Sequence, residues 1–348
     1  MNIIVIIQKT FFGCGFYRLY QPYNHLAKNY DVKVTLTSTI EEMDDDKLKE
    51  FDFVIWHKGL FNLKEIKRIK DLGIITIADF DDYWSVGREH TYYKEYTKEG
   101  QPAKLHKLLM AVDYIHCTTE ELADEIWKYN ENVEVLPNAI DTGYDSLKVQ
   151  REKDDKFVFG YLGGPCHTRD VALLREVPEA TKAHFRLFGY NGSDIYKFYE
   201  SILEKGNNFS RFQGADIWNY PRFYNYMDVS LVPLEDSKFN SMKSELKLIE
   251  AGTFSKGVIV SNVLPYINII RHGKNCLAAE SKHDWVNYIK LLDRNHNIAS
   301  DLGAQLHEDT KQYDISEVNK KRYKFLQDVH KKHNSNSSHE FSRVVNVN

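Results

Sequence analysis

The sequence is poor in cysteine and has no long apolar run. Its four cysteines, Cys14, Cys117, Cys166 and Cys276, lack the close spacing of zinc ligands and of secreted disulfide frameworks, so we expect reduced, mostly buried thiols and no zinc site. No apolar run approaches the ~20 residues that a membrane-spanning helix needs. The opening segment, MNIIVIIQKT, has neither the basic lead nor the small-residue cleavage site of a signal peptide. These absences predict a cytoplasmic protein without a transmembrane segment, and they leave peripheral membrane contact open.

Neither sign of charge dominates the chain, whose formal net charge is −4. Residues 1–150 hold 18 Lys and Arg against 25 Asp and Glu, whereas the remainder is mildly basic. An acidic first half does not favour a long polyanion such as nucleic acid as a partner, and a basic second half suits a small anionic ligand. Hydrophobic residues at 42% and aromatic residues at 13% exclude an intrinsically disordered chain.

Apolar strand patterns alternate with helical patterns along the chain. NIIVII at residues 2–7 is a continuous apolar run, which is typical of a parallel strand buried on both faces, and FDFVIWHKG and GIITIADF are further strand segments. After a polar, charge-dense stretch, FVFGYLGG repeats the strand-then-glycine pattern of the first half. We therefore predict an α/β fold with two tandem Rossmann-like domains that face a central cleft. The predicted parts are residues 1–145, a linker over 146–156, residues 157–313, a helix over 314–333 and a frayed tail over 334–348.

Two glycines follow the first predicted strand. Gly13 and Gly15 precede a helix predicted over residues 17–29, where the missing Cβ atoms allow backbone N–H groups to approach a phosphate. A tight structural turn explains them equally well, and Arg18 is either an anion ligand or a solvated side chain. The third glycine of a dinucleotide fingerprint is absent, which argues against NAD.

The second predicted domain opens in the same way. Gly163 and Gly164 follow a strand, and His167 and Arg169 add hydrogen-bond donors close to a predicted helix start. Exposed amides at this point suit a diphosphate. A plain helix-entry turn is the alternative, and it is less favoured because the pattern opens both halves of the chain.

The segment FNSMKSELKLIEAG holds the densest group of functional side chains. On a helix starting near Ser241, Lys243, Lys247 and Glu250 fall at i, i+4 and i+7 and share one face. Carboxylates accept ribose hydroxyls and ammonium groups neutralise phosphate, so this face suits a nucleotide-sugar. The alternative is a solvated helix face with ordinary ion pairs.

Three aspartates follow the strand in IADFDDYW. Asp79, Asp81 and Asp82 have a spacing that could bind a divalent ion with a diphosphate, which would fit a single-domain, metal-dependent transferase. That reading is less favoured because it gives the second domain no role, and local turn hydrogen bonds are the simplest explanation. His57 also ends a predicted strand facing the cleft, although a lone histidine is more often structural.

Together these segments resemble the retaining, GT-B-fold glycosyltransferases of the group-1 (family four) type over roughly residues 2–330. In the first domain the resemblance rests on GCGFYRLYQP, on IADFDDYW, and on CTTEELADEI followed by VEVLPNAID. In the second it rests on GYLGGPCHTRDV and on the run from FNSMKSELKLIEAG to VIVSN, which is the most specific block. The resemblance implies that the second domain binds a UDP- or GDP-sugar and the first binds the acceptor. It also implies a C-terminal helix that crosses back to the first domain.

The resemblance also implies roles for single residues. Glu250 matches the family glutamate that holds the ribose, while Met242 replaces the glutamate that usually contacts the donor sugar, so the donor sugar stays unassigned. Lys243 and Lys247 are the implied catalytic cations, with His57 near the donor sugar. Further donor-side residues are Gly13, Gly15, Gly163, Gly164, His167, Arg169 and Ser244, and the acceptor side holds Arg18, Asp79, Asp81 and Asp82.

The predicted function is transfer of a sugar to a hydroxyl acceptor with retention of anomeric configuration. The acceptor is a glycan, a lipid-linked saccharide or a protein side chain. Because the transition state resembles an oxocarbenium ion, the site must chiefly stabilise the departing diphosphate, and we expect no cofactor and no metal. The alternatives are a phage-type DNA-base glucosyltransferase, which would need a basic groove, and a non-catalytic sugar-nucleotide-binding protein that lost the donor contact at Met242.

Overall fold

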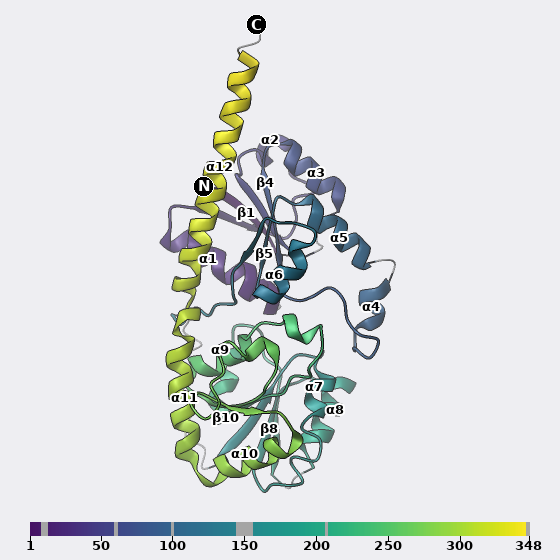
Figure 1. The fold of residues 1–348 in the computed structure, drawn as a ribbon, viewed down its shortest axis with the longest axis vertical. Helices are drawn as coiled ribbons and strands as arrows, with labels where there is room; N and C mark the ends of the chain where they lie inside the picture. The colour runs from purple at the N-terminus through teal and green to yellow at the C-terminus, as the bar shows by residue number, and fades with distance from the viewer. Residues whose placement is uncertain (8–12, 59–61, 99–100, 144–155, 206–207, 346–348) are drawn as a thin grey trace.

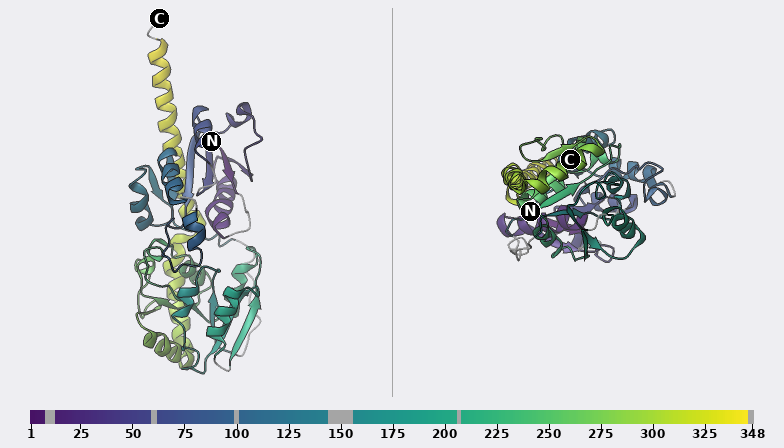
Figure 2. Two further views of the ribbon diagram at one scale, coloured as in Figure 1. Left: turned by 90° about the vertical axis from the view of Figure 1, so that its right-hand side faces the viewer. Right: turned by 90° about the horizontal axis from the view of Figure 1, so that it is seen from below.

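A computed structural model describes residues 1–7, 13–58, 62–98, 101–143, 156–205 and 208–345, with side chains described as far as residue 335. Within these residues the chain forms two α/β domains stacked end to end, joined along one side by a long helix (Figures 1 and 2). The predicted pair of Rossmann-like domains is confirmed. The predicted linker over 146–156 lies outside the described residues except for Lys156.

The first domain is built on a six-stranded sheet with the order β2-β1-β3-β4-β5-β6, and every described pairing is parallel. β4 is buried over its full length, as its apolar sequence requires for a central strand covered on both faces. The strands are β1 (Asn2–Ile6), β2 (Lys33–Thr37), β3 (Phe53–His57), β4 (Ile75–Phe80), β5 (Tyr114–Cys117) and β6 (Val133–Val135).

The second domain repeats this design with the order β12-β11-β10-β7-β8-β9, again with parallel pairings. Its central strands β7, β10 and β11 are buried throughout. The strands are β7 (Val158–Leu162), β8 (His184–Tyr190), β9 (Phe209–Gln213), β10 (Val229–Val232), β11 (Gly257–Ser261) and β12 (Leu277–Ala279).

Helices cover the sheets of both domains (Figure 1). In the first domain they are a π-helical segment η1 (Gly15–Tyr20), α1 (Gln21–Asn29), α2 (Asp45–Leu48), α3 (Leu63–Asp71), α4 (Tyr93–Thr97), α5 (Gln101–Ala111) and α6 (Glu120–Trp127). In the second they are α7 (Thr168–Ala172), α8 (Asp194–Leu203), α9 (Leu246–Thr253), α10 (Lys282–Arg294), α11 (His296–Thr310) and the 3-10 segments η4 (Tyr220–Tyr226), η5 (Asn240–Met242), η6 (Leu264–Tyr266) and η7 (Lys311–Tyr313). None of the described helices is long and apolar enough to cross a bilayer.

The long helix α12 (Ile315–Val345) runs from the second domain along the first and projects beyond it (Figure 1). Leu326 and Val329 join the core beneath β1, β3 and β4, and the Asn319 amide donates to the Pro22 carbonyl at 2.8 Å. The predicted return of a C-terminal helix to the first domain is therefore confirmed. The predicted end of this helix at residue 333 and the frayed tail after it differ from the structure, because residues 315–345 contain no glycine or proline to stop the helix.

Two predicted helix starts and one thiol also differ from the structure. Gly13 is already helical and Gly15 opens η1, so these glycines belong to the first helical turns instead of a loop before residue 17. The helix predicted from Ser241 begins only at Leu246, because η5 and an extended Lys243 precede it. Cys14 is exposed, whereas Cys117 and Cys276 are buried and Cys166 is half-buried, all with free thiols.

Candidate functional site

A cavity of about 550 Å³ lies between the carboxyl ends of the two sheets, and we call it the central cavity. In open parallel sheets this edge is where ligands bind, because the loops there are not needed to hold the sheet together. Of the predicted site residues, its walls include Gly13, Arg18, Asp81, Asp82, Gly163, Gly164, His167, Lys243, Ser244, Lys247 and Glu250. Gly15, His57, Asp79 and Arg169 are not part of its lining.

The glycine loop after β7 forms one wall of the central cavity. The Gly163 carbonyl accepts a hydrogen bond from the Tyr196 hydroxyl, and the Gly164 carbonyl accepts one from Tyr199, both at 2.9 Å. These two hydrogen bonds from α8 hold the glycine loop in place. A Cβ atom on Gly163 would lie 2.4 Å from the Tyr161 hydroxyl oxygen, so this residue must be glycine for steric reasons, whereas a Cβ on Gly164 would meet nothing within 4 Å.

The two glycines give a matched pair of variants. Gly163→Ala is expected to lower the free energy of unfolding by about 1–3 kcal/mol, because the Tyr161 ring is fully buried and cannot give way. Gly164→Ala should leave stability nearly unchanged. Urea unfolding of both variants measures the difference, and equal losses would contradict the packing argument.

Two lysines enter the central cavity from the second domain. The Lys243 ammonium lies 3.5 Å from the Asp82 carboxylate of the first domain. Burial lowers the pKa of Lys243, but the attraction of Asp82 outweighs burial, so the pKa is raised. Lys247 follows it on the first turn of α9, and its ammonium lies 5.3 Å from the centre of the Tyr161 ring. Burial lowers the pKa of Lys247, and no carboxylate of the described residues pairs with it. Lys247 is therefore a half-buried cation available to an anionic ligand.

Glu250 on α9 is enclosed by three tyrosines. Tyr17 donates to one carboxylate oxygen at 2.8 Å, and Tyr220 and Tyr224 donate to the other at 3.0 and 2.8 Å. Burial raises the pKa of Glu250, and the three hydroxyl donors work against that rise. Because Tyr17 belongs to η1, this cluster also ties the first domain to the second. Three of the roughly four acceptor positions of a carboxylate are thus filled, and Glu250 is part of the cavity lining.

A chain of charged groups crosses the first-domain wall of the cavity. Asp81 accepts from His57 at 3.0 Å and from the Lys58 ammonium at 2.6 Å, and Asp82 lies 3.7 Å from the same ammonium. Burial raises the pKa of Asp81, but Lys58 and His57 outweigh this and hold it well below its usual value. Lys58 has a φ of 49°, a strained conformation for a side-chain-bearing residue. The sequence analysis did not single out Lys58, although it directly follows His57.

Three side chains of this wall meet the distance requirement for a metal. A sulfur of Cys14, a ring nitrogen of His57 and a carboxylate oxygen of Asp81 all lie within 4.8 Å of one another. Burial raises the pKa of Cys14, so its thiol is protonated, and the Lys58 ammonium already occupies Asp81. A cation would have to displace both the proton and the ammonium, so the group fits a hydrogen-bonded cluster better than a metal centre.

Arg18 and Asp79 form a buried pair at the base of the first domain's cavity wall. Arg18 donates to both Asp79 oxygens, at 2.8 and 2.9 Å, and its remaining nitrogen donates to the Leu136 carbonyl at 2.6 Å. Both side chains are 1% exposed. Burial opposes the Arg18 charge, but Asp79 outweighs it and raises the pKa of Arg18. The guanidinium of Arg18 therefore has a structural role, because its hydrogen-bond donors are used within the protein.

Cys166 stands at the edge of the central cavity. Burial raises the pKa of its thiol, but the neighbouring His167 and Lys243 outweigh burial and lower it to about 7. His167 is itself held by Asp170, whose carboxylate lies 2.5 Å from Nδ1. A thiol of this kind is partly ionised near neutral pH and reacts with alkylating reagents.

Met242, which stands where the resemblance leads one to expect a glutamate, points away from the central cavity. Its side chain is 4% exposed and packs into the core of the first domain, beside Leu122 and Ala123 of α6. The Thr119 hydroxyl donates to its carbonyl at 3.5 Å. Asn138, which the sequence analysis did not single out, lines the cavity and donates to Ser244 at 2.6 Å, which adds a second link between the domains.

Protein-family models and curated proteins gave no match to this chain. Solved structures resemble it over nearly its whole length. Sucrose-phosphate synthase from Thermosynechococcus elongatus has a TM-score of 0.68 at 12% identity and covers 94% of this chain and 99% of its own. HepE from Anabaena, solved with UDP and glucose, has a TM-score of 0.66 at 12% identity and covers 94% of this chain and 100% of its own. A glycosyltransferase from Rickettsia africae has a TM-score of 0.64 at 10% identity and covers 95% of this chain and 98% of its own. At such low identity the likeness establishes a common fold.

Proposed function

Since the chain has the GT-B fold of two facing Rossmann-like domains, we propose that it is a glycosyltransferase that moves a sugar from a nucleotide-sugar to a hydroxyl acceptor. The observation that carries the proposal is the half-buried ammonium of Lys247, which forms no ion pair among the described residues and lies beside the Gly163 loop in a cavity between the two sheets. A UDP-sugar is the proposed donor, because HepE, which has the same fold, was solved with UDP and with UDP-glucose.

The proposed donor site follows from the charges of the central cavity. A departing diphosphate gains negative charge, and Lys247 and Lys243 would neutralise it, with the amides of the Gly163 and Gly164 loop as further donors. Glu250 and its tyrosines would hold the ribose, since they offer one open carboxylate position and hydroxyl oxygens. These groups stabilise a leaving group and need not supply a nucleophile.

We propose that the reaction retains anomeric configuration and proceeds without a metal. An oxygen of the donor's own diphosphate would take the proton of the acceptor hydroxyl, so no side-chain base is required at the reacting carbon. Two lysine ammonium groups provide the positive charge that a divalent ion supplies in other transferases. Asp81 is paired with Lys58, and Asp82 lies within ion-pair distance of Lys58 and Lys243, so these carboxylates do not offer a free diphosphate–metal site.

A thermal-shift screen tests the donor proposal. UDP-, GDP-, ADP- and CMP-sugars are added to the purified protein with and without EDTA, and release of free nucleotide is followed in parallel. We expect UDP-sugars to raise the melting temperature, with the shift unchanged by EDTA and reduced in Glu250→Gln. Each shift is measured against the melting temperature of the same protein without ligand. This matters for Glu250→Gln, because the substitution weakens the hydrogen bonds from the three tyrosines and can change the stability by itself.

Three outcomes of this screen would contradict the proposal. No shift with any nucleotide-sugar would count against a donor site in the central cavity. A shift that EDTA abolishes would contradict the metal-independent reaction. An undiminished shift in Glu250→Gln would move the ribose away from α9.

A further inference from the structure

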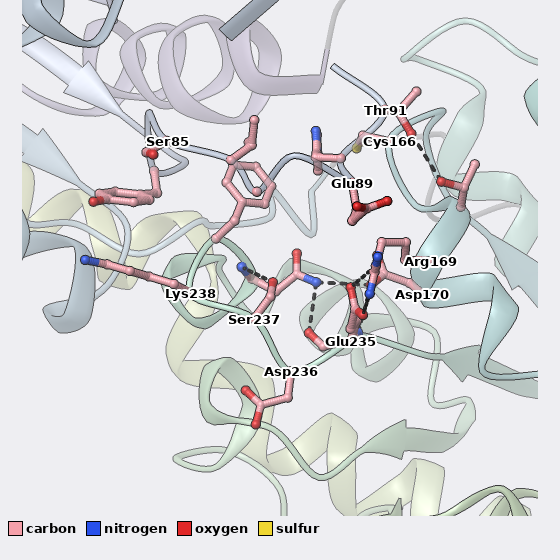
Figure 3. Close-up of a pocket in the computed structure, with 17 residues that line it drawn as sticks. Ser85, Glu89, Thr91, Cys166, Arg169, Asp170, Glu235, Asp236, Ser237 and Lys238 are labelled. Carbon is pink, nitrogen blue, oxygen red and sulfur yellow. Dashed lines mark hydrogen bonds and ion pairs between the residues drawn. The ribbon is translucent and has the colours of Figure 1, made fainter. Parts of the chain in front are cut away.

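A second cavity, of about 530 Å³, lies beside the central cavity and between the same two domains (Figure 3). Its walls come from the segment after β4, from α7 and the loop before it, and from the loop after β10. Cys166 belongs to the lining of both cavities, so the two meet at this residue. At one point of the wall, the Thr91 hydroxyl of the first domain lies 3.1 Å from the Thr168 hydroxyl of the second. The second cavity is therefore formed only when both domains are present.

Acidic groups outnumber basic groups in the lining of the second cavity. Glu89 and Asp236 are exposed and form no ion pair among the described residues. The basic side chains are Arg169 and Lys238, against the carboxylates Glu89, Asp170, Glu235 and Asp236. The lining is thus net negative, which repels ligands that carry phosphate or carboxylate.

Both cations of the second cavity are already neutralised. Arg169 pairs with Glu235 through two hydrogen bonds, one of them 2.6 Å long, and Figure 3 shows the two side chains facing each other. The Lys238 ammonium lies 3.2 Å from Glu125 and 5.2 Å from the centre of the Tyr83 ring. Neither cation is free to receive an anion, in contrast to Lys247 in the central cavity.

The remaining lining groups suit a polyhydroxyl ligand. Tyr83, His90 and Phe239 contribute aromatic surface, and the His90 and Phe239 rings pack edge to face at 4.9 Å. Aromatic faces pack against the apolar faces of sugar rings, while the carboxylates of Glu89 and Asp236 accept hydrogen bonds from hydroxyls. The volume falls in the range of small-ligand sites and admits a saccharide unit.

We propose that the second cavity binds the acceptor, and that this acceptor is an uncharged saccharide and not an anionic glycan, a phosphorylated lipid headgroup or a nucleic acid. The inference rests on the proposed function. The acceptor hydroxyl would enter the central cavity past Cys166. There its oxygen bonds to the anomeric carbon as the bond from that carbon to the diphosphate breaks, and the hydroxyl proton passes to a diphosphate oxygen.

A blocking variant tests this placement. Ser85 is exposed in the segment after β4 and lines the second cavity, so Ser85→Trp puts an indole at its wall (Figure 3). We expect kcat/KM for transfer to a neutral methyl glycoside to fall by at least about tenfold, while UDP-sugar hydrolysis without acceptor is unchanged. Ser300→Trp, on an exposed position of α11, is the matched control and should behave as the parent. Unaltered transfer by Ser85→Trp would overturn the proposal.

A second readout does not depend on sugar transfer. Alkylation of Cys166 by iodoacetamide is followed by mass spectrometry without nucleotide. Neutral methyl glucoside or methyl N-acetylglucosaminide should slow labelling of Cys166, whereas methyl glucuronide and glucose 6-phosphate should not, and Ser85→Trp should abolish the protection. Protection by the anionic sugars that Ser85→Trp also abolishes, or no protection by the neutral ones, would refute the acceptor class. If neutral sugars protect but no nucleotide-sugar binds, the saccharide site stands and the proposed donor chemistry fails.

Discussion

Replacing Lys247 by methionine is expected to lower the rate of sugar transfer by about 10²–10³-fold, the usual loss when a preorganised group facing a developing negative charge is removed. The Lys247 ammonium lines the central cavity beside the Gly163 loop, where it would meet the departing diphosphate. Water cannot replace it fully, because the cavity wall is buried and a bulk solvent dipole must reorient at the moment of reaction.

The same variant should be at least as stable as the parent protein. Burial lowers the pKa of Lys247, which means that its charge destabilises the native state. No described carboxylate forms an ion pair with Lys247 that would offset this effect. Methionine keeps most of the side-chain volume without the charge. The measurements are kcat/KM for transfer and the midpoint of urea unfolding without ligand.

Lys197→Met is the matched control, because Lys197 is an exposed lysine on α8 whose ion-pair partner among the described residues is the neighbouring Asp194. It should change neither activity nor stability. Full activity in Lys247→Met would remove Lys247 from the donor site. A large loss of stability would instead make it a structural residue, and the loss of transfer could no longer be read as chemistry.

Replacing Arg18 by alanine is expected to lower the free energy of unfolding by about 3–5 kcal/mol, the cost of leaving one partner of a buried pair without its counter-charge. Asp79 is 1% exposed and loses both of its hydrogen bonds from the guanidinium. The Leu136 carbonyl also loses a donor. Urea unfolding gives the value, and such a loss is a large fraction of the roughly 5–15 kcal/mol by which native proteins are stable.

Two comparisons separate pairing from general damage. Arg169→Ala removes an arginine whose side chain is 50% exposed and paired with Glu235, and it should cost less than about 1 kcal/mol. The double variant Arg18→Leu with Asp79→Leu should recover part of the loss, because no lone carboxylate remains. A loss for Arg18→Ala as small as that for Arg169→Ala would contradict a buried, mutually dependent pair.

The fold could be predicted from the sequence to a large extent. NIIVII, FDFVIWH and ITIADF are predominantly apolar, and the structure makes each of them a parallel strand. β4 is buried throughout, and β1 and β3 are buried except for Asn2 and His57. The glycines after β7 and the lysine–glutamate block also fell in loops and a helix at the carboxyl edge of a sheet. Both kinds of inference use local sequence, since strand burial and strand-end loops are decided within a few residues.

The helix boundary before α9 could not be predicted in this way. The periodicity from Ser241 onward suggested one continuous helix, yet Lys243 is extended because Met242 inserts into the core of the first domain. A residue far away in the chain, Thr119, holds the Met242 carbonyl. Lys243 and Lys247 nevertheless line the same cavity. Lys243 does so from the extended segment before α9 and Lys247 from the first turn of α9, so they do not share one helix face.

The sequence by itself determined two parallel α/β domains, the edge at which their ligands lie and the residue types gathered there, because hydrophobic periodicity and turn chemistry are properties of short segments. Only the tertiary structure decided which of those residues have their charges already satisfied. Tyr17 donates to Glu250 across 233 positions, Asp79 accepts two hydrogen bonds from Arg18, and Lys247 forms no ion pair with a described carboxylate, although Asp170 and Glu250 lie near enough to favour its charge. Such pairings depend on how the chain folds and how the two domains pack against each other. They form because burying an unpaired charge is costly in free energy, and a local sequence pattern does not show which charges are buried.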